Sequence, residues 1–152
     1  MKHVFSKKII KAGLIVGALD ILAACIQYYI KTGKNPERVL KFIASGVFGK
    51  AANTNGNIMI LWGLIFHFFI AFSFTLFFFW LTDKIPSVLK NKLLTGAVYG
   101  IFIWSVMKFL VLPLSNTHKI PFNFINAIIA ILILIVCIGI PLAFLKGKST
   151  RS

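Results

Sequence analysis

The stretch Val16–Tyr29, VGALDILAACIQYY, is an apolar segment that carries an aspartate, Asp20, near its middle. It lies inside a longer apolar run, Ile9–Ile30, and a helix needs about 20 such residues to cross the hydrocarbon core of a bilayer. Hydrocarbon offers the backbone no hydrogen-bond partners, so a run of this kind must be helical. The stretch therefore predicts a membrane-spanning helix with a carboxyl group inside the membrane, where an ionisable side chain is a functional-site hypothesis.

Three further apolar runs are long enough to span a bilayer, and they lie at about Ile58–Leu81, Leu93–Leu112 and Phe124–Leu145. The chain has 152 residues, is 59% hydrophobic and has a mean hydropathy of +0.90. Soluble domains are far less apolar. The sequence predicts an all-α protein: one integral membrane domain over residues 1–152, built as a four-transmembrane-helix bundle.

The segment between the first two spans, about residues 36–50, has its own helix signal. Asn35-Pro36-Glu37 is typical of a helix start, with a capping side chain, a proline and an acid in sequence. Apolar residues then fall on one face, which indicates a short amphipathic helix. It lies either in the headgroup plane or as a re-entrant segment, because its small residues allow close approach to the bundle. Its residues expected nearest a pocket are Arg38, Ser45 and Gly46.

Charge is strongly one-sided, with 17 Lys and Arg against three Asp and Glu and a formal net charge of +14. No RNA-binding or zinc-finger motif accompanies it, so we expect no nucleic acid partner and a contact with anionic lipid headgroups instead. With the N-terminus inside, the ten inner basic residues are Lys2, Lys7, Lys8, Lys11, Lys84, Lys90, Lys92, Lys146, Lys148 and Arg151. The seven outer ones are Lys31, Lys34, Arg38, Lys41, Lys50, Lys108 and Lys119. The excess favours cytoplasmic termini, and the basic first loop is an anomaly.

Two stripes of small residues predict where helices pack. Gly13, Gly17, Asp20, Ala24 and Gln27 share one face of the first span, and Gly96, Gly100, Trp104 and Lys108 share one face of the third. Glycines spaced by four let two helix backbones approach closely. We therefore expect the first and third spans to touch at Gly17 and Gly100, and to diverge toward Asp20 and Lys108.

Four polar side chains are predicted to meet in the bundle interior: Asp20, Gln27, His67 and Lys108. By helix rise, Asp20 and His67 lie at similar depth in the membrane, and Lys108 leans back toward them. Two interpretations stay open. The cluster is either a structural ion pair that fixes helix register, or a polar pocket that conducts or binds a proton or ion. Lys108 could also extend toward the membrane surface and leave Asp20 to His67.

The motifs of enzymes and metal proteins are missing from this sequence. It has no HExxH motif, no pair of histidines at ligand spacing and no phosphate-binding glycine loop. Cys25 and Cys137 both lie in apolar runs and form no CxxC pair. We expect no metal, no cofactor and no catalytic residues, which favours a protein that is not an enzyme.

Five segments resemble a family of small bacterial four-span membrane proteins. They are GLIVGALDILAA (13–24), RVLKFIASGVFGKAA (38–52), GLIFHFFIAF (63–72), YG with MKFLVLPLS (99–115) and GIPLA (139–143). The resemblance implies the four-span fold and a multi-pass location in the bacterial cytoplasmic membrane, and it implies no activity. Members of that family often carry a histidine in the last span, which Phe124–Leu145 lacks.

From these patterns we expect a membrane binding or transport module for a small polar solute, an ion or a proton, with a pocket that opens outward. The alternative is a non-catalytic accessory or scaffold protein in which the polar cluster is a structural ion pair. An enzyme comes third. The expected partners are a bilayer with anionic lipids and a small polar ligand or proton, and a homo-oligomer is left open.

Overall fold

The computed structural model describes residues 7–147 of the chain, and over that range it contains helices and no strand. Four helices are long and apolar enough to cross a membrane: Lys7–Thr32 (α1), Ile58–Lys84 (α3), Lys92–Leu114 and Phe124–Gly147. The predicted all-α bundle of four spans is therefore confirmed. Several residues in the charge count, such as Lys2, Lys148 and Arg151, lie outside the described range.

The third and fourth spans are each interrupted by one π-helical turn. The third consists of α4 (Lys92–Val106), η3 (Met107–Val111) and α5 (Leu112–Leu114), and the fourth of α6 (Phe124–Leu134), η4 (Ile135–Gly139) and α7 (Ile140–Gly147). Each π turn ends two residues before a proline, Pro113 or Pro141. A proline ring displaces the carbonyl four residues earlier, and a π turn re-pairs the backbone locally. Pro113 thus lies inside a helix, although the sequence placed it in the following loop.

Side-chain caps begin both of these spans. The Asn91 side chain accepts a hydrogen bond from the backbone N–H of Leu94 at 3.1 Å, and Asn123 accepts one from Asn126 at 3.0 Å. Asparagine is favoured at this position because it satisfies an N–H that the first turn leaves unpaired.

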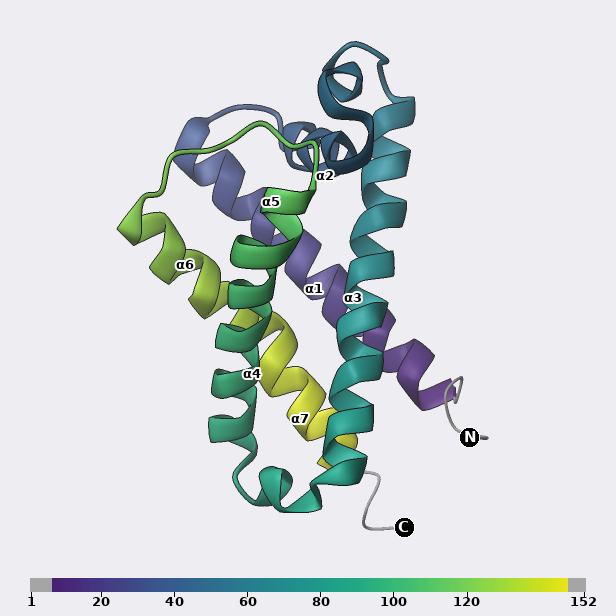
Figure 1. Ribbon diagram of the computed structural model, residues 1–152, viewed down its shortest axis with the longest axis vertical. Coiled ribbons are helices and arrows are strands. Elements are labelled where there is room, and N and C mark those ends of the chain that lie inside the picture. The colour runs from purple at the N-terminus through teal and green to yellow at the C-terminus, as the bar shows by residue number, and fades with distance from the viewer. Residues whose placement is uncertain (1–6, 148–152) are drawn as a thin grey trace.

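The predicted short helix between the first two spans is α2, Glu37–Phe48, followed by a 3₁₀ segment, η1, Gly49–Asn53. The Asn35 side chain accepts a hydrogen bond from the backbone N–H of Glu37 at 3.0 Å, so the asparagine orders the helix start. In Figure 1, α2 lies across one end of the bundle, opposite the end where α1 begins and the fourth span finishes; we call this the α2 end. It packs on α3, where Gly63 leaves room for the backbone of Leu40.

The glycine stripes pack on other helices than the sequence suggested. A β-carbon on Gly13 or Gly17 would meet the rings of Phe72 and Phe68 on α3. The glycines of α4 face the fourth span: Gly96 lies against Gly139 and Ile140, and Gly100 against Ile135. The expected contact between the first and third spans is therefore wrong. The fourth span has a glycine of its own, Gly139, at this contact. The backbone of the fourth span therefore lies closer to α4 than the backbone of α1 lies to α4.

The four spans form an incomplete ring in the order α3, α1, fourth span, third span. An aromatic contact closes it near the termini, where the Tyr99 hydroxyl donates to the Phe74 carbonyl at 2.5 Å and its ring lies 4.8 Å from that of Phe78. Beyond this contact, toward the α2 end, side chains of α3 and of the third span line a cavity that keeps the two helices apart. This separation positions the candidate site.

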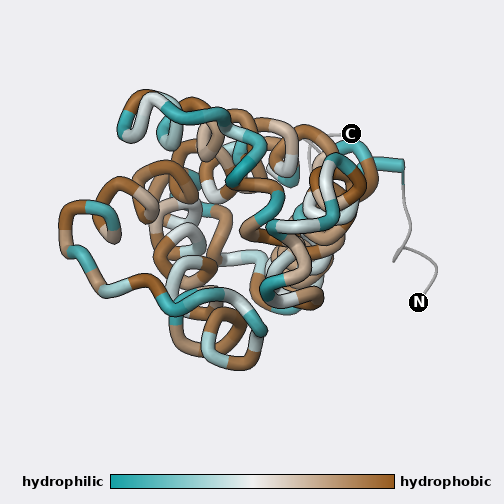
Figure 2. Tube along the Cα trace, turned by 90° about the horizontal axis from the view of Figure 1, so that it is seen from above, coloured by the Kyte–Doolittle hydropathy of each residue, from teal (hydrophilic) through white to brown (hydrophobic). Residues whose placement is uncertain are grey.

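Large apolar side chains cover the outside of the bundle. Leu22, Phe69 and Phe109 are 59%, 71% and 72% exposed. In Figure 2 the hydrophilic residues gather mainly in the segments that connect the helices. An apolar exterior with polar ends is the arrangement of a protein whose helices contact lipid.

Candidate intramembrane binding site

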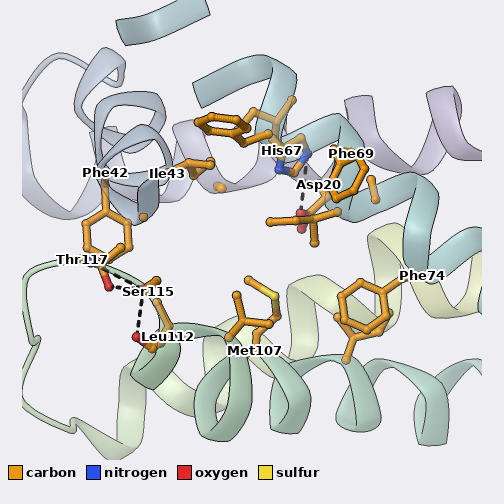
Figure 3. A pocket seen from close by; sticks show the side chains of 18 of the residues that line it. Asp20, Phe42, Ile43, His67, Phe69, Phe74, Met107, Leu112, Ser115 and Thr117 are labelled. Atoms are coloured by element: carbon orange, nitrogen blue, oxygen red, sulfur yellow. Dashed lines mark hydrogen bonds and ion pairs between the residues drawn. The ribbon is translucent and has the colours of Figure 1, made fainter. Parts of the chain in front are cut away.

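A cavity of about 630 Å³ occupies the space where α3 and the third span separate. All four spans and α2 contribute to its wall. Only four of the lining residues have a side-chain nitrogen or oxygen: Asp20, His67, Ser115 and Thr117. Figure 3 shows the first two together on one wall and the last two together at the end nearest Phe42. The cavity is therefore an apolar chamber with one ionisable pair, and its size is typical of ligand sites, which measure roughly 300–1,000 Å³.

The cavity is open at its edge rather than sealed. Val47, Ile65 and Phe69 all line it, and they are 57%, 47% and 71% exposed. Ile65 and Phe69 lie in α3, one of the four helices that are long and apolar enough to cross a membrane, and their side chains face outward from the bundle. In a bilayer, hydrocarbon would surround this side, so a ligand could pass between the cavity and the lipid without crossing water.

Asp20 lies 13 residues after the first residue of α1 and 12 before the last, so it is midway along the helix. His67, on α3, is the facing ionisable residue: its Nε2 lies 3.9 Å from Asp20 Oδ2. The Asp20 side chain is only 18% exposed and the His67 side chain only 10%. The sequence predicted these two residues at the same depth, and the structure brings them together on the cavity wall.

The Asp20 carboxylate accepts no hydrogen bond from any described residue, 7–147; its one polar contact there is the 3.9 Å approach of His67. Within that range, no fully enclosed side-chain nitrogen or oxygen lacks a hydrogen-bond partner. The carboxylate oxygens are therefore not enclosed, and they can be reached from the cavity. A half-paired carboxylate at this depth favours a partner supplied from outside the chain, such as a proton or a ligand donor.

His67 also joins two helices. Its Nε2 lies 2.8 Å from the carbonyl oxygen of Gly17 on α1. A carbonyl can only accept, so Nε2 carries the proton and donates it to this bond. Gly17 is thus both a packing residue and a hydrogen-bond partner, which fixes the imidazole beside Asp20.

Lys108 does not join this pair among the described residues. It lies in the π turn η3, half-buried, with its ammonium nitrogen 5.6 Å from the centre of the Phe122 ring. Of the two expectations for Lys108, the ion pair with Asp20 is therefore wrong, and the alternative, which leaves Asp20 to His67, agrees with the structure. The side chain reaches instead toward the loop that follows the third span.

Gln27 and the three α2 residues have separate places. Gln27 is half-buried and is not among the residues that line the cavity. Gly46 lines the cavity, whereas Arg38 and Ser45 line a second, neighbouring hollow. The buried Ser45 hydroxyl donates to the Phe42 carbonyl at 2.6 Å, so it is already engaged.

The sequence reasoning missed the end wall of the cavity, which the segment after the third span supplies. The hydroxyls of Ser115 and Thr117 lie 2.8 Å apart, and the backbone N–H of Asn116 donates to the Gly46 carbonyl at 2.9 Å. It also missed the π turns, which contribute Met107, Val111 and Ile138 to the wall. Pro113 and Pro141 were the available signal, since π turns in membrane helices accompany prolines and are frequent at functional sites.

Among the described residues, no group of three or more His, Cys, Asp or Glu side chains lies close enough to hold a metal ion. Cys25 and Cys137 are both free and half-buried. Compared with profiles of known families, with curated proteins and with solved structures, the chain matches none of them.

Proposed function

We propose that this membrane protein is an intramembrane binding module that takes up a largely apolar ligand from the bilayer. In this proposal Asp20, with His67 beside it, binds the one polar group of that ligand or a proton. The observation that carries the proposal is the Asp20 carboxylate, which lies on the wall of an open cavity with no hydrogen bond from the described chain.

The chemistry of the wall selects the ligand class. Eighteen of the 22 lining residues have no side-chain nitrogen or oxygen, so a small polar solute would lose its hydration without replacement. An amphipathic molecule would instead place its hydrocarbon against the wall and one cationic or hydrogen-bond-donating group against Asp20. Transport of such a molecule or of a proton would use the same site.

The second candidate is an accessory or scaffold protein in which the pair only fixes helix packing. The hydrogen bond from His67 to the Gly17 carbonyl favours it, because that bond ties α3 to α1. The open cavity beside the pair favours binding, since a purely structural pair would be expected in a closed contact.

The proposed location is the bacterial cytoplasmic membrane, with both termini in the cytoplasm. The resemblance of its five segments to bacterial four-span proteins supports the compartment. The ten-to-seven excess of basic residues on the side of the termini supports the orientation.

The sequence makes a direct test available, because Asp20 and Asp83 are its only aspartates. Labelling aspartate side-chain carboxyls with carbon-13 gives two solid-state NMR signals in liposomes, which Asp83→Asn assigns. Dodecylamine should shift the Asp20 signal saturably, whereas the uncharged dodecanol should not. Asp83 is 64% exposed and pairs with Lys146 near the termini, so it serves as the internal control.

Two outcomes would contradict the proposal. An Asp20 signal that ignores dodecylamine, combined with a lower melting temperature of Asp20→Asn, would establish the structural role instead. Equal shifts of the Asp20 and Asp83 signals would show a general effect of the amine on the membrane.

A further inference from the structure

A second hollow, of about 1,100 Å³, lies at the α2 end beside the cavity. We call it the basic groove, after its five basic lining residues: Arg38, Lys41, Lys50, His118 and Lys119. They come from α2, η1 and the segment after the third span, so distant parts of the sequence converge there. Tyr28, Asn53 and Asn116 add uncharged polar groups.

The positive charge of the groove is not neutralised within the described chain. All three acidic residues of the protein are described, and its two ion pairs there join Asp20 to His67 and Asp83 to Lys146. Glu37 forms neither of these pairs and does not line the groove. An uncompensated cluster of Lys and Arg in a hollow is suited to a phosphate, which each can contact through charge-assisted hydrogen bonds.

The groove and the cavity meet at Phe42 and Thr117, which line both. Figure 3 shows these two side chains together at one end of the cavity, with Phe74 at the other end. Hydrogen bonds hold this junction in place: Asn116 donates from its backbone to the Gly46 carbonyl at 2.9 Å and from its side chain to the Val47 carbonyl at 3.2 Å. A cation-lined hollow thus adjoins a hydrocarbon-lined one.

We infer that the groove and the cavity together form one binding site for a lipid that carries a phosphate headgroup. The phosphate binds among the basic groove residues, and an acyl chain passes Phe42 and Thr117 into the cavity. The open edge beside Ile65 and Phe69 admits the chain from the bilayer. This inference rests on the cavity being a ligand site, as proposed above, with Asp20 binding a proton there, because an acyl chain offers the carboxylate no polar group; the headgroup binds in the groove.

A lipid phosphate bound in the groove would also explain why the first loop is so basic. Four of the seven Lys and Arg residues at the α2 end line the groove: Arg38, Lys41, Lys50 and Lys119. Of the rest, Lys31 donates to the Asn126 side chain at 2.7 Å and Lys108 lies over Phe122. A role in ligand binding would explain basic residues on the outer side of the membrane, where the preference of Lys and Arg for the cytoplasmic side disfavours them.

The test measures lipid binding to the full chain in neutral detergent by native mass spectrometry. Three probes separate the contributions: phosphatidic acid, diacylglycerol with the same acyl chains, and inorganic phosphate. Phosphatidic acid should bind as one tightly held molecule, with a dissociation constant at least about tenfold lower than that of either other probe. Equal binding of diacylglycerol would overturn the inference, and so would equal binding of inorganic phosphate.

A matched pair of triple variants tests whether the groove itself is responsible. Arg38→Gln/Lys50→Gln/Lys119→Gln removes three exposed charges from the groove and should weaken phosphatidic acid binding by at least about tenfold. Lys34→Gln/Lys84→Gln/Lys90→Gln removes three exposed charges elsewhere and should leave it unchanged. Equal weakening in both would show general electrostatic attraction and would overturn the inference.

One further variant tests the cavity, and the dodecylamine experiment separates this inference from the proposed function. Ala24→Trp fills the cavity and should weaken phosphatidic acid binding, whereas full affinity in a variant with a wild-type melting temperature would overturn the shared site. The dodecylamine experiment reads the Asp20 carboxyl of the unmodified chain, which the phosphate contacts do not involve. Groove-dependent phosphatidic acid binding without any amine response would therefore defeat the role of Asp20 alone.

Discussion

Asp20 is a carboxyl group midway along a membrane helix, and its surroundings in the folded chain only half satisfy it. A charged side chain at the centre of a bilayer costs at least about 2.5–3.5 kcal/mol on the insertion scale. The Nε2 atom of His67 lies 3.9 Å from Asp20 Oδ2, but its N–H donates a hydrogen bond to the Gly17 carbonyl oxygen at 2.8 Å. The imidazole therefore orients the site more than it neutralises the carboxylate.

Removal of Lys108 tests this description at the level of single residues. Because its ammonium lies over Phe122 and not beside Asp20, Lys108→Met should change the free energy of unfolding by less than about 1 kcal/mol. The double variant with Asp20→Asn should show the sum of the single effects, as expected for sites without shared partners. Thermal unfolding of both single variants and the double variant in one detergent measures this. A coupling energy above about 1 kcal/mol would indicate a direct ion pair.

Part of the site could be predicted from the sequence, and helix geometry explains which part. Asp20 and His67 lie on uninterrupted α-helices, so depth and face follow from residue number. Lys108 shares a four-residue stripe with Gly96 and Gly100 only if the third span is α-helical throughout. The π turn begins at Met107, and from there the α-helical period no longer applies. The basic groove required tertiary contacts between α2 and the segment after the third span, which no local pattern encodes.

At the level of elements, the glycines determine which helices pack together. Gly96 and Gly100 face backbone atoms of the fourth span, whereas Gly13 and Gly17 face aromatic rings and the Ala71 methyl group of α3. A ring can turn aside for an added methyl group more easily than a backbone can. The contact between the third and fourth spans should therefore tolerate substitution less than the contact between α1 and α3.

Alanine substitution checks this ranking. Gly100→Ala should destabilise the protein by about 1–3 kcal/mol, because its new β-carbon would lie against the backbone of Ile135. Gly46→Ala is the matched control, since its β-carbon would only reach ordinary contact with Ser115 and Thr117, at 3.7 and 3.8 Å. Melting temperatures in detergent give the comparison. Equal stability of the two variants would contradict the close packing of α4 on the fourth span.

The number and approximate limits of the spans followed from hydropathy, because hydrocarbon imposes helices of a minimum length. The lateral arrangement did not follow, because several apolar faces could each pack against any other in lipid. Besides Gly96 and Gly100 of the third span, Gly139 of the fourth span lies at this contact, against Gly96, and allows the two backbones to approach closely. The sequence reasoning had assigned it to no contact.

For the whole molecule, the distribution of charge predicts an orientation. The basic groove and α2 should face away from the cytoplasm, with both termini inside. In a background without Cys25 and Cys137, Lys34→Cys should react with a membrane-impermeant thiol reagent on intact cells, and Lys90→Cys should not. Both side chains are exposed, so accessibility alone does not separate them. The reverse labelling pattern would place the groove on the cytoplasmic side.

The position of Asp20 midway along α1 has an electrical consequence. Moving one elementary charge across a membrane at 100 mV involves about 2.3 kcal/mol, so a cation that reaches the middle experiences about half of that. A proton or ammonium group that enters the cavity from water on one side would therefore bind Asp20 several-fold more or less strongly for each 100 mV. Asp83, exposed near the termini, would respond to voltage far less. The affinity of the site for a cation or proton would thus depend on the membrane potential.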